Sequence, residues 1–356
     1  MTTHWLQYLE MISKTRFFKS AVLILLAAVL VCGCTGKPRP IRQTELALGT
    51  VCSVSLFDSS KQALLPASFS LISQLESKIS KNIPDSEISV LNRSSGLSPV
   101  VLSQPVFQLL TMAQKYSILS EGMFDVTIDP VVELWGIGTE GAAVPERDKL
   151  EHALSLVDYR NLVLDPEQKS AFLPKSELAV DLGGIAKGYI ADKVKDFLVS
   201  EGASGGIIDL GGNILAFGKK PDGSDFRIGI QDPFGGRGSS IGVVTMAQGS
   251  VVTSGIYERF FEQDGKRYHH IFDVRTGFPV ENSLTGVSII TQESAAGDAL
   301  STAVFALGLE KGMALVEKTD GVEAVFITKD KEVYISSGLK DSFTLTDRNF
   351  KMRGMF

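Results

Sequence analysis

The stretch VDLGGIAKGYIADKVKDFLV, residues 180–199, combines several kinds of local structure. Its first residues predict the end of a strand at Val180 and Asp181, and the glycine pair at 183–184 predicts a tight turn. From Ile185 to Val199 the apolar residues recur at helical spacing and share one face. A strand that passes through a glycine turn into an amphipathic helix indicates a domain that mixes α and β structure.

Further strands and helices are predicted on both sides of this stretch. Apolar residues three and four positions apart predict helices, whereas alternating or continuous apolar residues predict strands. Helices are expected at 68–80, 106–119 and 295–307, and strands at 46–57, 207–217 with a tight turn at 211–212, 226–231, 241–246, 286–290, 322–328 and 333–335. The elements are interleaved without a regular βαβ repeat, which predicts an α+β fold with mixed sheets and packed helices.

The N-terminus has the pattern of an export signal. Positive residues precede an apolar run at 21–31, which is shorter than the ~20 residues that a membrane-spanning helix needs. The run ends in Val31-Cys32-Gly33-Cys34, which resembles a bacterial lipobox. We therefore expect a signal peptide at 1–33, a lipid on Cys34 that holds the protein at a bacterial membrane in the periplasm, a tether at 34–44 and one domain at 45–356. The alternatives are an ordinary signal peptide cut near Gly33 and an uncleaved anchor.

Composition excludes some classes of function. Once Cys32 is removed and Cys34 is lipidated, only Cys52 remains, so an internal disulfide is not expected. The net charge is −6 with scattered Lys and Arg, which argues against a nucleic-acid partner. The four histidines and the lack of a CxxC pair argue against a zinc site.

The glycine turn at 181–188 is a candidate binding site for an anion. A turn that leads into a helix presents backbone N–H groups, and the helix N-terminus favours negative charge. Lys187 adds a positive charge suited to phosphate. The alternative is a plain glycine turn followed by a solvated lysine.

A second candidate site lies at 297–303. On a helix, Asp298, Ser301 and Thr302 share one face, and their oxygen atoms suit a hard cation such as Mg²⁺. The alternative is an N-capping aspartate with hydroxyl groups that bond back to the helix.

A third candidate is the segment 268–279, together with 253–259. Neighbouring residues of a strand point to opposite faces, so at most one of His269 and His270 would face a site, and a neutral histidine is a natural general base. The alternative is a turn with an internal ion pair between Asp273 and Arg275. The segment 122–127 by itself indicates core packing.

Taken in order, these segments resemble the FAD:protein FMN transferase family of ApbE-like lipoproteins. The similar stretches are ALGT at 47–50, PDSEISVLN at 84–92, MFDVT at 123–127, ELWGIG at 133–138, DLGGIAKGYIAD at 181–192, LGGN at 210–213, TSGIYERFF at 253–261, HHIFDVRTGFP at 269–279 and GDALSTA at 297–303. Each stretch is short, but the ordered set covers nearly all of the chain after Cys34.

The resemblance implies a single catalytic unit related to the T-fold and a specific reaction. Family members bind FAD, use Mg²⁺ at its pyrophosphate, release AMP and attach FMN through a phosphoester to a threonine hydroxyl of an acceptor protein, such as a membrane redox subunit. The implied metal ligands are Asp298 and Thr302, with Ser301 adjacent, and a backbone oxygen of Gly184 or Ala186. His270 matches the histidine expected to activate the hydroxyl. The implied FAD contacts are Leu48, Asn82, Met123, Phe124, Asp125, Asp181, Lys187 and Phe272.

Two positions depart from the family pattern. Leu48 replaces a methionine of similar volume. Asn82 stands where many members carry an aromatic ring near the flavin, and loss of a stacking ring would admit water. Hydrolysis of FAD to FMN and AMP is therefore a second hypothesis, and a flavin-binding lipoprotein without catalysis is a third.

Overall fold

The structure is a computed structural model that describes residues 40–236 and 238–354. The predicted signal peptide, Cys34 and the first part of the predicted tether lie outside the described residues. From Pro40 onward the chain forms one compact unit with the α+β composition that the sequence predicts.

A mixed sheet forms the centre of this unit. Its strand order is β1-β2-β6-β7-β10-β13-β14-β15-β17, and neighbours run antiparallel except for the parallel pair β15–β17. The strands are β1 (Ile41–Ala47), β2 (Thr50–Leu56), β6 (Gly205–Leu210), β7 (Asn213–Gly218), β10 (Gly249–Gly255), β13 (Leu284–Thr291), β14 (Glu323–Thr328), β15 (Glu332–Ile335) and β17 (Lys351–Met352). Two-residue turns join β1 to β2 and β6 to β7, so both hairpin tips lie at the same end of the sheet.

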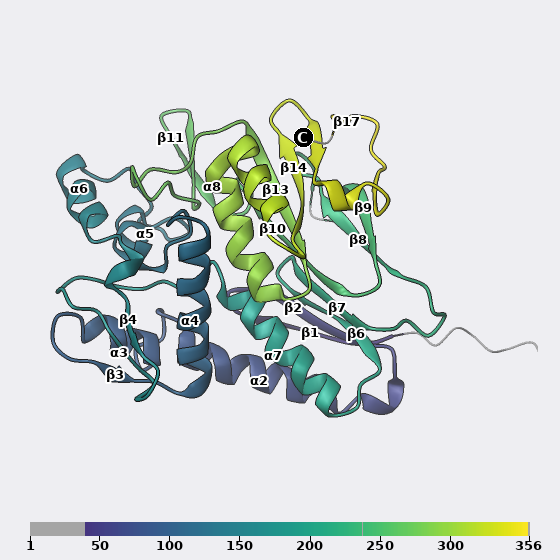
Figure 1. Cartoon of the computed structure of the whole chain (residues 1–356), viewed down its shortest axis with the longest axis horizontal. Helices are drawn as coiled ribbons and strands as arrows, with labels where there is room; N and C mark the ends of the chain where they lie inside the picture. The colour runs from purple at the N-terminus through teal and green to yellow at the C-terminus, as the bar shows by residue number, and fades with distance from the viewer. Residues whose placement is uncertain (1–39, 237, 355–356) are drawn as a thin grey trace, which may run out of the picture. The chain divides into compact units, whose positions relative to one another are not determined.

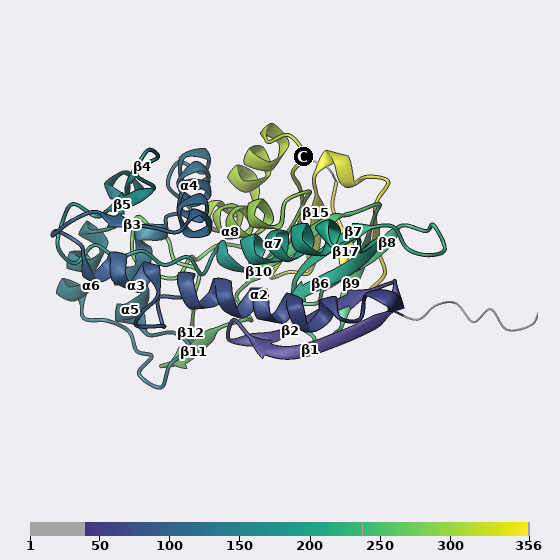
Figure 2. The same ribbon diagram turned by 90° about the horizontal axis from the view of Figure 1, so that it is seen from below.

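Three long helices cover one face of this sheet. They are α2 (Leu64–Ile79), α7 (Ala186–Ser200) and α8 (Ser294–Lys318), and Figures 1 and 2 show α7 lying between the other two. Their apolar faces form the main core with the inward-facing residues of the strands. By length and hydropathy α8 alone among the described helices could cross a membrane, but most of it is buried, as expected of a core helix.

Smaller elements complete the unit. The sheet β16-β9-β8, made of β8 (Phe226–Gln231), β9 (Ser240–Met246) and β16 (Phe343–Leu345), packs on the other face through a second core. A lobe contains α3 (Glu87–Arg93), α4 (Gln104–Leu119), α5 (Asp129–Trp135), α6 (Arg147–Ser155) and the sheet of β3 (Val100–Val101), β5 (Ser170–Phe172) and β4 (Val163–Asp165). The hairpin β11 (Phe260–Gln263) and β12 (Lys266–His269) stands apart from the sheets, and 3₁₀ turns lie at Ser59–Lys61, Val126–Ile128, Tyr159–Asn161 and Ser337–Leu339.

Three local predictions were wrong in detail. The strand expected at 46–57 is split by a turn in which Leu48 has φ 55° and Gly49 has φ 68°, and β1 begins at Ile41, inside the predicted tether. The helix expected at 295–307 continues to Lys318 because the chain resumes its helical course after a break at Gly308, which has φ 79°.

The strand expected to end at Asp181 is also absent. Residues 173–182 have no regular structure. A side chain holds this segment instead, because Asn92 Oδ1 accepts from Val180 N at 2.8 Å and Asn92 Nδ2 donates to Val180 O at 3.0 Å. The turn and the helix that follow it are as predicted.

Candidate active site

A cavity of about 410 Å³ lies where the hairpin tips of the central sheet meet the N-terminal ends of α7 and α8. The walls combine residues from segments far apart in the sequence. They include Gly49, Thr50, Met123, Phe124, Asp125, Asp181, Gly183, Gly184, Lys187, Gly211, Asn213, residues 252–255, Glu258, Arg259, His270, Ile271, Phe272, Val274, Asp298 and Thr302. All three candidate segments from the sequence therefore contribute to one cavity.

Helices α7 and α8 cap each other at this cavity. Asp298 of α8 accepts from the backbone N–H of Gly188 at 2.9 Å, and Asp192 of α7 accepts from the N–H groups of Ser294 and Ala295 at 3.0 and 2.9 Å. Each carboxylate satisfies N–H groups that a helix leaves unpaired at its start. A Cβ atom at Gly188 would lie only 2.2 Å from Ser294 O, so the glycine permits the close approach. The bond to Gly188 fixes where the Asp298 carboxylate stands.

Asp298 and Lys187 form the charged part of the wall. Asp298 is 4% exposed, and its Oδ1 lies 3.7 Å from Lys187 Nζ. Since Oδ2 is occupied by the cap, Oδ1 is the carboxylate oxygen directed to Lys187. If an anionic ligand drew the Lys187 ammonium towards itself, Asp298 Oδ1 would be available to bind a cation.

The oxygen donors around Asp298 fit Mg²⁺. Thr302 lies one turn further along α8, and a Cβ at Gly184 would stand 3.5 Å from Thr302 Oγ1, so the glycine backbone approaches the hydroxyl closely. A carboxylate, a hydroxyl and a backbone carbonyl are hard donors, which suits Mg²⁺. No cluster of three or more His, Cys, Asp or Glu side chains able to hold a metal occurs in the described parts of the chain. The remaining ligands would therefore come from substrate or water.

The two histidines lie in different surroundings, as the alternation along a strand predicts. His269 is 6% exposed and its Nε2 is 3.0 Å from Val280 O, so it belongs to the core. His270 lines the cavity, with Nδ1 3.2 Å from Arg259 O. Because a carbonyl can only accept, Nδ1 carries the proton and Nε2 is free to accept one. Burial, and then the charge of Arg259, lower the pKa of His270 to about 3, so the ring is neutral at pH 7.

Asp181 is held in the wall by a lysine that the sequence analysis missed. Its Oδ1 accepts from Gly183 N at 2.7 Å, and its Oδ2 lies 3.4 Å from Lys81 Nζ. Lys81 also pairs with Asp129 and, at 2.6 Å, with Glu133. Burial opposes the charge of Lys81, but Asp181 and Asp129 outweigh burial and hold its pKa above the ordinary value. Burial raises the pKa of Asp129 to about 6, against the effect of Lys81.

The segment 123–125 forms an apolar part of the wall. Met123 and Phe124 are almost fully buried, and so is Phe272 on the segment after β12. Asp125 has both oxygens engaged, because Oδ1 accepts from Thr127 N and Oγ1 and Oδ2 accepts from Tyr159 N. Its carboxylate therefore holds the local loop, while Phe124 and Phe272 offer rings to a planar ligand.

Four of the predicted site residues do not line the cavity. Leu48 is in the turn before Gly49, and Asn82 is exposed beside Lys81. Ala186 is the first residue of α7, behind the wall, and Ser301 turns to the sheet, where its Oγ is 2.8 Å from Ser254 Oγ. The cavity wall also contains residues that were not predicted as site residues, although most of them fall within or beside the stretches that carry the resemblance: Gly49, Thr50, Ile128, Val132, Ile137, Asn213 and Val252.

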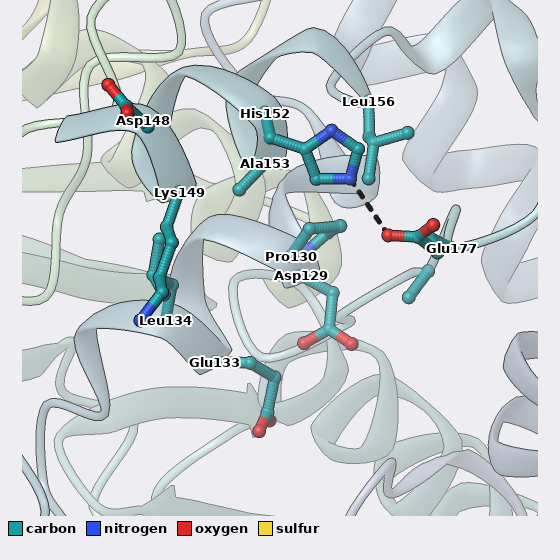
Figure 3. A pocket seen from close by; sticks show the side chains of 11 residues that line it. Asp129, Pro130, Glu133, Leu134, Asp148, Lys149, His152, Ala153, Leu156 and Glu177 are labelled. Atoms are coloured by element: carbon teal, nitrogen blue, oxygen red, sulfur yellow. Dashed lines mark hydrogen bonds and ion pairs between the residues drawn. The ribbon is translucent and has the colours of Figure 1, made fainter. Parts of the chain in front are cut away.

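A second, more open cavity of about 580 Å³ lies on the other side of α5 (Figure 3). Its floor is apolar, and its rim carries an exposed pair of His152 and Glu177 at 2.8 Å. Exposed pairs contribute little energy. Asp129 and Glu133 line this cavity and reach Lys81, so the two cavities are joined by one ion-pair network.

Comparison with known proteins assigns the family. A sequence model described as the ApbE family matches residues 48–326, which is most of the chain. The chain belongs to the ApbE family. It is 38% identical over 309 residues to an FAD:protein FMN transferase of Klebsiella pneumoniae (87% of this chain, 96% of that protein), and 37% identical over 356 residues to one of Treponema pallidum (95% and 98%).

Solved structures of ApbE proteins have the same fold. The protein from Thermotoga maritima has a TM-score of 0.79 at 29% identity and covers 85% of this chain and 98% of its own. The flavin transferase ApbE from Vibrio cholerae has a TM-score of 0.76 at 28% identity and covers 85% and 99%. The predicted α+β architecture of the ApbE type is thereby confirmed.

Proposed function

We propose that this chain is a flavin transferase that moves FMN from FAD to a threonine hydroxyl of an acceptor protein and releases AMP. The names of its relatives support flavin transfer from FAD to protein. The observation that carries the proposal for this chain is the convergence of Lys187, His270, Asp298 and Thr302 on one cavity. A non-catalytic flavin carrier would have no evident need for this combination.

The reaction exchanges the phosphoanhydride bond of FAD for a phosphoester bond to threonine. The threonine oxygen attacks the phosphorus atom of the FMN half of FAD, and the bond from that phosphorus to the bridging oxygen breaks. AMP leaves with the bridging oxygen and its electron pair, and the threonine proton passes to a base. The attack needs a held pyrophosphate, a neutralised negative charge and a proton acceptor.

His270 is the proposed proton acceptor. Its Nδ1–H is held by Arg259 O, which leaves Nε2 to take the threonine proton. Burial lowers the pKa of His270 in the free protein, and the positive charges of Arg259 and Lys187 lower it further. A bound pyrophosphate would offset those charges and raise the basicity of His270 when the reaction requires it.

Lys187, Asp298 and Thr302 are proposed to hold the phosphates. Lys187 is the second residue of α7 and its Nζ lies 3.7 Å from Asp298 Oδ1, and both its positive charge and the N-terminus of the helix favour the pyrophosphate. Asp298, Thr302 and the backbone of Gly184 would hold Mg²⁺, which when bound neutralises charge on the phosphate oxygens. Lys81 and Gly183 keep the Asp181 carboxylate in place, where it can accept from an N–H or O–H group of the nucleotide.

Hydrolysis of FAD would use the same residues with water in place of threonine. The departure at Asn82 suggested this reaction, and Asn82 is exposed and outside the cavity wall in the structure. If the missing ring admits water, Asn82→Tyr should lower the yield of free FMN relative to protein-bound FMN.

We also propose that lipid on Cys34 holds the enzyme at a bacterial membrane, on the periplasmic side. An acceptor that is a subunit of a membrane redox complex would then share one surface with the enzyme. Confinement to that surface raises the encounter rate.

The test is to incubate the purified chain with FAD, Mg²⁺ and solubilised membranes from a strain that lacks this protein. Tryptic peptides are then searched for FMN on threonine, and AMP is measured by chromatography. Transfer predicts modified threonine and AMP in equal amounts. Free FMN and AMP without a modified protein would establish hydrolysis instead.

A further inference from the structure

Strand β1 forms an open edge of the central sheet that leads to the active-site cavity. Among residues 40–236 and 238–354 it pairs only with β2, and it is the terminal strand of the sheet that these residues form. The β1–β2 hairpin turns at Leu48 and Gly49, and Gly49 and Thr50 belong to the cavity wall. A chain laid along β1 would therefore arrive at the cavity.

The register shows which backbone groups this edge offers. A two-residue turn makes Ala47 and Thr50 a hydrogen-bonded pair. From there along the hairpin, hydrogen-bonded pairs alternate with pairs whose backbone groups point away from each other. Arg42, Thr44 and Leu46 then direct their N–H and C=O groups away from β2. These groups match the spacing of a partner strand, which could pair with them as an added strand.

The side chains at the cavity end of this edge are apolar and uncovered. Leu46 is 83% exposed and its cross-strand neighbour Val51 is 46% exposed. Both lie on the face of the sheet opposite the helices, since Cys52 and Val54 on the other face are fully buried. Proteins commonly protect an open edge with charged residues, proline or a bulge. Strand β1, IRQTELA, carries the charged residues Arg42 and Glu45 but no proline, lysine or bulge, and its cavity end at Leu46 is apolar.

We propose that β1 binds the acceptor protein by accepting an extended segment of it as an additional strand. This proposal rests on the proposed function and adds the place where the acceptor protein binds. The segment that fits is extended, pairs with the outward groups of Arg42, Thr44 and Leu46, and covers Leu46 and Val51 with apolar side chains. Its threonine lies a few residues further on, beyond the level of Ala47, at the mouth of the cavity. Each residue of such a strand advances by about 3.3 Å, so a short extension is enough.

Thr44 offers a matched pair of variants. Thr44→Pro removes the outward N–H without removing a bond to β2, whereas Thr44→Ala shortens the side chain and keeps the N–H. Leu46→Asp removes the apolar contact, and Leu97→Asp changes a leucine that is 78% exposed elsewhere on the surface. Each variant is first checked for its thermal unfolding midpoint and for FAD binding by flavin fluorescence, which should match the wild type.

The experiment measures protein-bound flavin with solubilised membranes of the deletion strain as the source of acceptor. Thr44→Pro and Leu46→Asp should each lower kcat/KM for the acceptor by about tenfold, as expected for one lost intermolecular backbone bond or one lost apolar contact. Thr44→Ala and Leu97→Asp should stay within about twofold of the wild type, a range that corresponds to less than half a kcal/mol.

The possible results separate the two proposals. Equal flavinylation by all variants would overturn the docking site and leave the proposed function standing. A wild-type chain that modifies no protein would overturn both. A wild-type dimer in sedimentation that Leu46→Asp makes monomeric would assign the edge to a second copy of this chain and overturn the acceptor assignment.

Discussion

Replacing Asp298 tests two roles that the structure gives to one side chain. Its Oδ2 caps α7 through Gly188 N, and its Oδ1 faces Lys187 in the cavity. Asp298→Ala removes both, whereas Asp298→Asn keeps a carbonyl oxygen for the cap and removes the negative charge. The two variants should therefore differ in stability and agree in activity.

The expected loss of stability follows from the buried N–H of Gly188. Gly188 is buried, so without an acceptor its N–H loses a hydrogen bond that water cannot replace. An unsatisfied buried donor costs about 1–3 kcal/mol, and Asp298→Ala should lower the free energy of unfolding by about that amount. Asp298→Asn should cost less than about 1 kcal/mol, because a neutral bond replaces a charge-assisted one.

Asp192 supplies the control, because it caps α8 as Asp298 caps α7 and is not part of the cavity wall. Asp192→Ala should be destabilised about as much as Asp298→Ala but should keep FMN transfer once corrected for folded protein. Stability is measured by urea unfolding, and activity by AMP release with FAD at saturating Mg²⁺.

Transfer by Asp298→Asn should fall by at least about a hundredfold, since loss of a charged metal ligand costs several kcal/mol of transition-state stabilisation. Full turnover by Asp298→Asn or Asp298→Ala in Mg²⁺ would refute the metal assignment. Equal stability of Asp298→Ala and Asp298→Asn would refute the cap.

Four further predictions concern other residues in and beside the site. Asp181→Ala should raise KM for FAD by about tenfold with little change in kcat, and Lys81→Met should do the same more weakly; a fall in kcat alone would contradict a binding role. Since the pKa of His270 is about 3, kcat/KM for FAD should show no limb near pH 6.5 from this group, and an NMR titration of the His270 ring with a midpoint near pH 6.5 would refute the lowered pKa. The lowered pKa also means that unfolding takes up a proton below pH 6.5, so stability should fall from pH 6.5 towards pH 3, less steeply in His270→Asn. Gly188→Ala should cost about 3 kcal/mol in urea unfolding, because its Cβ would collide with Ser294 O, and wild-type stability would show that α7 and α8 can separate.

The sequence predicted the fold class and the long elements because their apolar periodicity is local. It located Lys187, His270 and Asp298 as candidates, since glycine turns and polar residues on apolar elements stand out. That these three residues belong to one site could be predicted only from the resemblance of the ordered segments to a known family. No local pattern shows that residues 187 and 298 meet, because the contact depends on the close approach of α7 and α8 at Gly188.

The features that were missed depend on long-range contacts. Lys81 looks like an ordinary surface lysine in sequence, yet Asp129, Glu133 and Asp181 surround it in the fold. The segment before Asp181 was predicted as a strand from its apolar residues, whereas the side chain of Asn92 satisfies its backbone. A leucine in the left-handed region at position 48 splits a run of strand-forming residues.

The central claim is that the cavity transfers FMN to protein. It is tested most directly by mass spectrometry of the protein that becomes fluorescent when the chain, FAD and Mg²⁺ are incubated with membranes of the deletion strain. The account predicts FMN in phosphoester linkage on one threonine, one AMP per modified threonine, and loss of both products with His270→Asn. AMP and free FMN from the wild type with every threonine unmodified would contradict it.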